Sequence, residues 1–384
     1  MRYIDFHCDT LTELGEEETL KRNNKSVDIE GLKEAGVLVQ CCSMFVPTGI
    51  LGADDRGRPL PHLTGHKRIK AECDRIYSVY CRELGNNQDC LRPVLGFEDV
   101  KACINDKKTG ILLTIEDGGV LAAGASETES GSLREESRGK IKEEGGEESR
   151  GESTEKSKEE GRGESSEKSN EECRKVIRSL DDMYKKGVRL ITLTWNHENC
   201  IGYPNSDNAD IMAKGLKKTG IEVVERMNEL GMIVDVSHLS DGGFYQVAEL
   251  MAKAKRPFVA SHSNSRAVTG HPRNMTDQMI RMLAAQGGVM GLNLAPHFLD
   301  DTQRKDGSSR IADMVRHILH IRSVGGADVL AIGSDFDGIE GQLEVKRPQD
   351  FEMLWSELAK AGVSSSELEK MWQGNGLRVL SELL

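Results

Sequence analysis

Eight short apolar segments recur along the chain, and most of them are continuously hydrophobic rather than alternating. Such segments are typical of strands that are buried on both faces, as in a parallel sheet. Amphipathic stretches of helical length lie between them, and several end in glycine just before the next apolar segment, as a helix C-terminus should. The eight segments are residues 3–7, 37–46, 111–116, 189–195, 232–238, 258–263, 288–294 and 329–335.

This alternation predicts an α/β fold, a TIM-like (β/α)8 barrel, which needs about 250 residues. A doubly wound sheet is less consistent with the sequence, because no glycine-rich phosphate-binding turn follows any of the predicted strands. The predicted helices cover residues 65–85, 173–187, 209–231, 241–255, 275–288 and 308–326.

Residues 124–172 interrupt the pattern after the third predicted strand. This segment carries 16 acidic and 9 basic residues, and it accounts for most of the net charge of −12. It has too few apolar residues to offset the entropy of ordering, so we expect a disordered, low-complexity insertion. Residues 1–123 and 173–384 then form a single barrel domain. The insertion is expected to be a solvated spacer, with a protein-binding tail or a lid as the alternative.

The composition excludes several classes of protein. The nine cysteines lack CxxC spacing, which argues against a disulfide framework and against a thiolate zinc site. No secretory leader or apolar run of about 18 residues is evident, so we expect a cytoplasmic protein without a membrane partner. No basic and aromatic cluster suggests a nucleic-acid partner.

Polar side chains end five of the predicted strands. In "DFHCDT", a histidine and an aspartate two positions apart share one face of a strand and form a chelating pair. Each position has an ordinary structural explanation of its own, such as a turn or a helix cap. Six such positions at one end of a barrel instead favour a catalytic site. They are His7, Asp9, Glu116, His238, His262 and Asp335.

Three histidines and at least two carboxylates exceed the ligands that one tetrahedral zinc requires, so a two-metal site with one bridging carboxylate is inferred. Two metals that share a hydroxide supply a nucleophile at neutral pH, which predicts hydrolysis. Rival hydrolytic motifs, GxSxG and HExxH, are missing.

The loop after His262, "SHSNSRAVTGHPRNMTD", carries Arg266, His271 and Arg273. An arginine at this position is suited to clamp an anionic group of the substrate. A surface salt bridge is the equally weighted alternative.

Together these motifs resemble the membrane (renal-type) dipeptidase family of binuclear zinc peptidases. The resemblance runs from "DFHCDT" through "TIEDGG", "LTLTW", "DVSH", "SHSNSRAVTGHPRN" and "GSDFDG" to "GNGLRVL". It implies a TIM-like barrel with two Zn²⁺ ions bridged by Glu116 and a water or hydroxide. The implied ligands are His7, Asp9 and Glu116 for one zinc, and Glu116, His238 and His262 for the other.

The resemblance further implies that Arg273 binds the free C-terminal carboxylate of a dipeptide. Asp335 would orient the bridging water and carry a proton toward the leaving amine. Mammalian members have a histidine after "LTLT" that helps to stabilise the tetrahedral intermediate, but here Trp195 stands in that place. We expect His197 to take over this role and Trp195 to lie at the substrate. Because leader and anchor signals are not evident, we expect the sequence to be closer to the cytoplasmic bacterial members of the family.

The sequence therefore predicts a zinc dipeptidase, a metalloprotease whose partners are a dipeptide substrate and a second copy in a homodimer. One alternative is another binuclear barrel amidohydrolase that acts on lactones, amides or phosphoesters. The other is an inactive metal-bound scaffold.

Overall fold

The computed structural model describes residues 2–15, 17–53, 62–124, 156–300 and 307–384. All eight predicted apolar segments form parallel strands, most of them shorter than predicted. The barrel strands are β1 (Tyr3–Cys8), β2 (Val37–Phe45), β4 (Thr109–Glu116), β5 (Val188–Thr192), β6 (Ile233–Asp235), β7 (Val259–Ala260), β8 (Val289–Leu292) and β10 (Leu330–Ile332).

The strands close into a barrel. Each pairs with the next in the order given above, and the pair Asp5 and Ile332 joins β1 to β10. The longest ladder runs between β2 and β4, from Val39–Gly110 to Phe45–Glu116. Outside the barrel ring, β3 (Leu91–Pro93) adds to the start of β4, and β9 (Ser308–Ser309) pairs with β11 (Gln342–Leu343). The prediction of a (β/α)8 barrel is confirmed.

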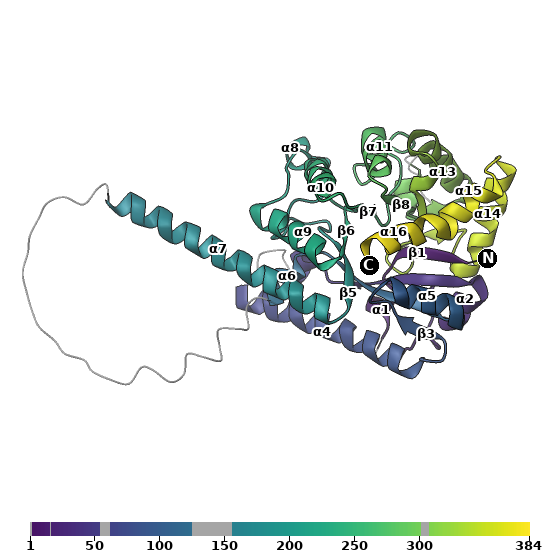
Figure 1. Cartoon of the computed structure of the whole chain (residues 1–384), viewed down its shortest axis with the longest axis horizontal. Helices are drawn as coiled ribbons and strands as arrows, with labels where there is room; N and C mark the ends of the chain where they lie inside the picture. The colour runs from purple at the N-terminus through teal and green to yellow at the C-terminus, as the bar shows by residue number, and fades with distance from the viewer. Residues whose placement is uncertain (1, 16, 54–61, 125–155, 301–306) are drawn as a thin grey trace, which may run out of the picture.

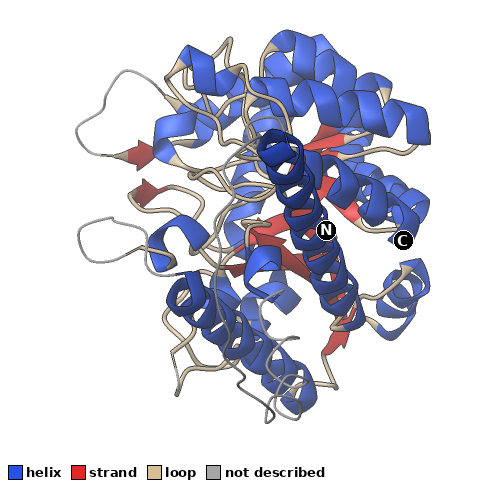
Figure 2. Cartoon of the chain, turned by 90° about the vertical axis from the view of Figure 1, so that its left-hand side faces the viewer, coloured by secondary structure: helices blue, strands red, loops and turns tan. Residues whose placement is uncertain are grey.

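Helices surround the strands, which occupy the centre of the view in Figure 2. The helices that follow β1 to β4 are α1 (Thr10–Glu13), α2 (Ile29–Ala35), α3 (Thr48–Leu51), α4 (His62–Asn86), α5 (Phe97–Asp106), α6 (Val120–Gly124) and α7 (Lys156–Lys185). Those that follow β5 to β8 are α8 (Ala209–Met212), α9 (Lys218–Leu230), α10 (Asp241–Ala254), α11 (Asp277–Ala285), α12 (Pro296–Leu299) and α13 (Ile311–Gly325). The remainder are η1 (Ala327–Val329), η2 (Pro348–Asp350), α14 (Phe351–Lys360), α15 (Ser365–Glu369), the π-helical turn η3 (Lys370–Gly374) and α16 (Asn375–Leu383).

Helix α7 differs from the prediction. It begins at Lys156, well before the expected start at residue 173, so the last part of the predicted disordered insertion is helical. Figure 1 shows the N-terminal half of α7 projecting from the barrel. Near its other end, contacts such as Arg226 Nε to Asp181 Oδ1 at 2.8 Å join it to α9. The predicted disorder of residues 125–155 lies outside the described residues. No described helix combines the length and apolarity needed to cross a membrane.

Helix α16 closes one end of the barrel. Its Val379 and Leu380 pack with interior strand residues such as Leu190 and Ile233 in one buried cluster. The carbonyl oxygen of Leu383 accepts a hydrogen bond from Arg256, which precedes β7, so the helix lies across the N-terminal ends of the strands. The opposite end, at the carboxyl ends of the strands, is therefore where a site can open to solvent.

Candidate metal centre

Six polar side chains meet at the carboxyl ends of the strands. They come from the end of β1, the end of β4 and the turns that follow β6, β7 and β10. All are at most 8% exposed. Two of them, His238 and Asp335, have backbone φ angles of 65° and 63°. Residues other than glycine rarely adopt this conformation, and such strain concentrates at functional sites. The six are His7, Asp9, Glu116, His238, His262 and Asp335.

Glu116 lies at the centre of this group, and its two carboxylate oxygens face different partners. Oε2 is 2.9 Å from His7 Nε2, while Oε1 is 3.1 Å from His238 Nε2 and 3.7 Å from His262 Nε2. His7 Nε2 is also 3.5 Å from Asp9 Oδ2. The side chains therefore form two overlapping ligand sets, His7–Asp9–Glu116 and Glu116–His238–His262, with the glutamate common to both.

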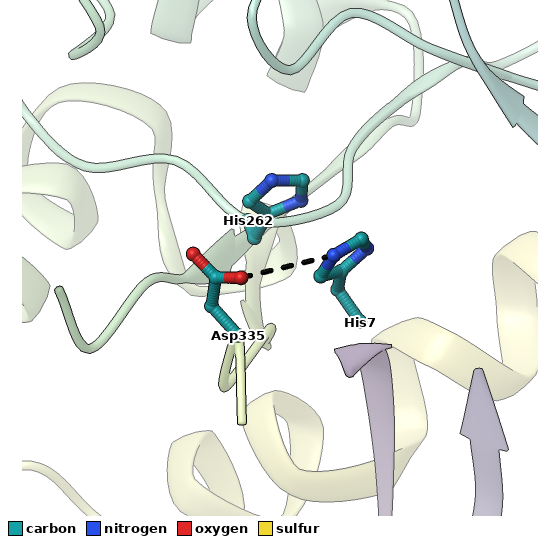
Figure 3. Close-up of side chains that lie close together, drawn as sticks. All are labelled: His7, His262 and Asp335. Carbon is teal, nitrogen blue, oxygen red and sulfur yellow. Dashed lines mark ion pairs between the residues drawn. The ribbon is translucent and has the colours of Figure 1, made fainter. Parts of the chain in front are cut away.

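A third set joins His7, His262 and Asp335 across the mouth of the barrel (Figure 3). Asp335 Oδ1 is 3.7 Å from His7 Nε2, and the rings of the two histidines stack at 3.9 Å. Asn293 donates a hydrogen bond from Nδ2 to Asp335 Oδ2 at 2.8 Å. This bond leaves Oδ1 directed toward the cluster.

Hydrogen bonds at Nδ1 fix the tautomers of two of the three histidines, His238 and His262, whereas His7 Nδ1 has no hydrogen-bond partner among the described residues. Ser261 Oγ donates to Asp235 Oδ2 at 2.5 Å, so it can only accept from His262 Nδ1, which is 2.6 Å away. His238 Nδ1 lies 3.0 Å from Asn196 Oδ1, which is likewise an acceptor. Both Nε2 atoms therefore carry lone pairs, yet they are 3.2 Å apart. A cation between the two Nε2 atoms would remove this repulsion. Histidines that bind a metal through one ring nitrogen typically donate the other ring N–H to an acceptor, as these two do.

The remaining polar atoms are arranged in the same way. His7 Nε2 approaches Glu116 closely but without hydrogen-bond geometry, and Asp9 Oδ1 has no hydrogen-bond partner among the described residues. Side chains that converge on a common cation have this arrangement, because each aims a lone pair at a point between them. The donor set of histidine and carboxylate fits a divalent transition metal, above all zinc.

Burial governs the protonation of the cluster. It raises the pKa of Glu116 to about 7, although His7 opposes the shift. It also lowers the pKa of His238 and of His262 well below the usual value. For His7, burial is outweighed by Glu116 and Asp9, which raise its pKa. Several buried carboxylates next to neutral imidazoles are costly without compensating positive charge, which bound cations supply.

A cavity of about 320 Å³ is lined by four of the six side chains, Asp9, Glu116, His238 and Asp335, and its volume suits a small ligand. One wall is aromatic, because the rings of Phe45 and Trp195 meet edge to face at 5.0 Å. The lining residues outside the six-residue group are Phe45, Trp195, Asn196, Ala295, Pro296, His297, Phe298, Gly338, Ile339 and Glu340.

The model of the membrane dipeptidase family, peptidase family M19, matches residues 171–383. The chain belongs to the membrane dipeptidase family. The matched segment contains His238 and His262, whereas His7 and Glu116 precede it and are brought beside them by closure of the barrel. The resemblance inferred from the motifs is confirmed, and with it the assignment to a family of metallopeptidases.

Relatives of this dipeptidase-family chain include an uncharacterized protein from the pqqA 5′ region of Klebsiella pneumoniae. It is 35% identical over 212 residues, which is 54% of this chain and 76% of that protein. The dipeptidase verJ of Clonostachys rogersoniana is 36% identical over 207 residues, 53% of this chain and 50% of verJ. The chain thus spans about half the length of the fungal dipeptidase.

Two solved structures share the fold across the whole chain. The probable dipeptidase PvdM from Pseudomonas aeruginosa has a TM-score of 0.76 at 17% identity, covering 100% of this chain and 95% of PvdM. A metallopeptidase from Rhodobacter sphaeroides, liganded with a phosphinate mimic of L-Ala-D-Ala, has a TM-score of 0.73 at 19% identity and coverages of 100% and 99%. At these identities the likeness concerns the fold alone.

The three residues predicted in the loop after β7 have different surroundings. Arg266 forms a two-pronged ion pair with Asp241, at 2.7 and 2.8 Å, and so has a structural role. His271 is half-buried and accepts the backbone N–H of Arg273. Arg273 is only 5% exposed and is not among the cavity-lining residues. It donates to the carbonyl oxygen of His262 at 2.8 Å, and its guanidinium lies 5.6 Å from the ring of Phe298, which does line the cavity.

The role predicted for His197 stays a prediction, and the structure places this residue beside the cavity rather than in its wall. Trp195 lines the cavity as expected, but His197 is exposed, is absent from the cavity wall and packs against Gly49 of α3. The chain leaves β5 in a loop, and the rings of Trp195 and His197 lie 5.7 Å apart, so His197 is next to the cavity wall.

Sequence reasoning did not identify several residues at the site. Asn196 contacts His238, Asn293 holds Asp335, and Ser261 fixes the ring of His262. Asn293 was detectable in principle, since it is a polar residue at the end of an apolar strand segment. The part played by Gly338 depends on its close approach to Asp9, which only the folded chain reveals.

Proposed function

We propose that this chain is a binuclear zinc dipeptidase that cleaves dipeptides with a free C-terminal carboxylate. The main support is the position of Glu116, whose two carboxylate oxygens face His7 on one side and His238 and His262 on the other. A carboxylate in this position is suited to bridge two cations, with Asp9 completing the first set. When bound, two zinc ions would lower the pKa of a shared water and polarise the scissile carbonyl.

Arg273 supports the choice of substrate. It is buried, its guanidinium lies 5.6 Å from the Phe298 ring, and no carboxylate of a described residue forms an ion pair with it. Of its five N–H donors, one goes to Ser263 Oγ and one to the His262 carbonyl oxygen, which leaves three, and Nε is a buried donor without a partner. A buried unpaired cation is costly. A substrate carboxylate would supply the missing anion and hold the dipeptide in register.

Asp335 is suited to move the proton. Burial raises the pKa of Asp335, and the bond from Asn293 fixes one oxygen so that the other faces the cluster. It would accept a proton from the attacking water and deliver it to the leaving amine nitrogen. The small cavity and its aromatic wall would limit the substrate to about two residues.

Wild-type protein loaded with zinc tests this proposal. We expect turnover of unblocked dipeptides, and we expect their C-terminal amides to be cleaved at least about 10²-fold more slowly in kcat/KM, because the amides leave Arg273 unpaired. Equal turnover of acids and amides would instead favour a general amidohydrolase. Two bound zinc ions without cleavage of any dipeptide in a broad panel would favour an inactive scaffold.

A further inference from the structure

The chain lacks the family histidine after "LTLT", and His197 lies outside the cavity. Bound zinc would polarise the carbonyl oxygen, and a protein donor in the cavity wall would add to the stabilisation of the negative charge that develops there. Arg273 is assigned to the substrate carboxylate. Among the described lining residues, His238 uses its N–H on Asn196, and the other side chains with N–H donors are Trp195, Asn196 and His297. His297 belongs to α12, on a different segment of the wall.

Asn196 is distinguished by its contact with a metal-ligand candidate. Its Oδ1 accepts from His238 Nδ1 at 3.0 Å, and this bond orients the whole side-chain amide because the group is planar. The amide nitrogen Nδ2 therefore projects from the other side of the group. It has no protein partner among the described residues, and the side chain is exposed to the cavity.

We propose that Asn196 is a catalytic residue whose Nδ2–H stabilises the oxyanion of the tetrahedral intermediate, an inference that rests on the proposed peptide hydrolysis. The donor is already oriented before reaction by His238, so no reorganisation is needed as charge develops. A preorganised neutral donor of this kind contributes most when its partner becomes charged. The same amide thus connects the orientation of His238 to the stabilisation of the transition state.

The variant Asn196→Asp tests the donor separately from the acceptor. Aspartate keeps an oxygen for His238 Nδ1 but removes the N–H. At saturating zinc, with two ions per chain verified by elemental analysis, we expect kcat to fall about 10²- to 10³-fold while KM changes less than about threefold. The affinity for a phosphinate dipeptide analogue, which mimics the tetrahedral species, should fall by the same factor as kcat/KM.

Two controls separate the possible outcomes. Asn86→Asp makes the same substitution at an exposed asparagine at the end of α4, outside the cavity lining, and should retain wild-type kcat and zinc content. If Asn196 only positions His238, Asn196→Ala should lose zinc affinity and recover wild-type kcat in excess zinc, and this rescue would overturn the inference. Wild-type-like kcat or phosphinate affinity in Asn196→Asp would overturn it as well. Because these comparisons use an active wild type, their failure is distinct from failure of the proposed function.

Discussion

Replacing Gly338 with alanine would place a methyl group inside the carboxylate cluster. A Cβ atom there would lie 2.7 Å from Asp335 Oδ1 and closer still to Asp9 Oδ2. Carbon–oxygen contacts are normally about 3.3 Å or longer, so both buried carboxylates would have to retreat by about 0.6 Å or more. The φ angle of Gly338 is not in the left-handed region, so alanine fits the backbone and the effect is steric.

The expected loss follows from this displacement. A shift approaching 1 Å in a catalytic group costs on the order of 10²-fold in rate, and disturbance around a metal ligand costs about 10- to 100-fold in metal affinity. Gly338→Ala should therefore bind zinc at least about 10-fold more weakly and lose about 10²-fold in kcat/KM. That loss in kcat/KM corresponds to about 2.7 kcal/mol of transition-state stabilisation.

Zinc content after dialysis against buffered zinc, followed by dipeptide kinetics, measures both effects. Gly85→Ala is the matched control, because a Cβ at Gly85 in α4 meets no atom within 4 Å. It should keep full activity and gain about 0.5–1 kcal/mol in unfolding free energy from helix propensity. Two zinc ions and kcat/KM within about threefold of wild type in Gly338→Ala would refute the steric reasoning.

Three further substitutions test other parts of the site and the fold. Glu116→Gln should lose at least about 10²-fold in kcat/KM and bind zinc more weakly, because an amide bridges poorly; full activity would remove Glu116 from the centre. Arg273→Met should lower kcat/KM for dipeptides about 10²- to 10³-fold while barely affecting kcat/KM for their C-terminal amides. Equal losses for dipeptides and amides would show that Arg273 does not bind the carboxylate. Burial lowers the pKa of His317 to about 4, so the stability due to neutral His317 is complete above pH 6.5 and is lost as the pH falls to 4. Between pH 6.5 and 4, the unfolding free energy of the wild type should drop by up to about 3 kcal/mol more than that of His317→Gln. The same pH dependence of the unfolding free energy in both proteins would contradict the lowered pKa of His317.

The barrel was predictable because its strands are buried on both faces and therefore stand out as apolar runs. The same pattern made Glu116 and His238 conspicuous as polar residues at strand ends, and the barrel places such ends together. The start of α7 was not predictable in this way, since residues 156–172 have no apolar periodicity. Helix there extends from a segment that packs on α9.

The side chains of the cavity wall could not be predicted from the apolar pattern of the sequence, for a different reason. After β5 the chain enters a loop, and sequence spacing does not determine which of Trp195, Asn196 and His197 faces the cavity. The hydrogen bond between Asn196 and His238 joins residues 42 positions apart. Contacts of this kind depend on the relative placement of two loops, which a single sequence does not encode as a local pattern.

Anomalous X-ray diffraction at the zinc edge from crystals of the zinc-loaded protein tests the central claim most directly. The account predicts two peaks about 3.5–4 Å apart on either side of the Glu116 carboxylate, one beside His7 and Asp9 and the other beside His238 and His262. A single peak, or a pair of peaks away from Glu116, would contradict it.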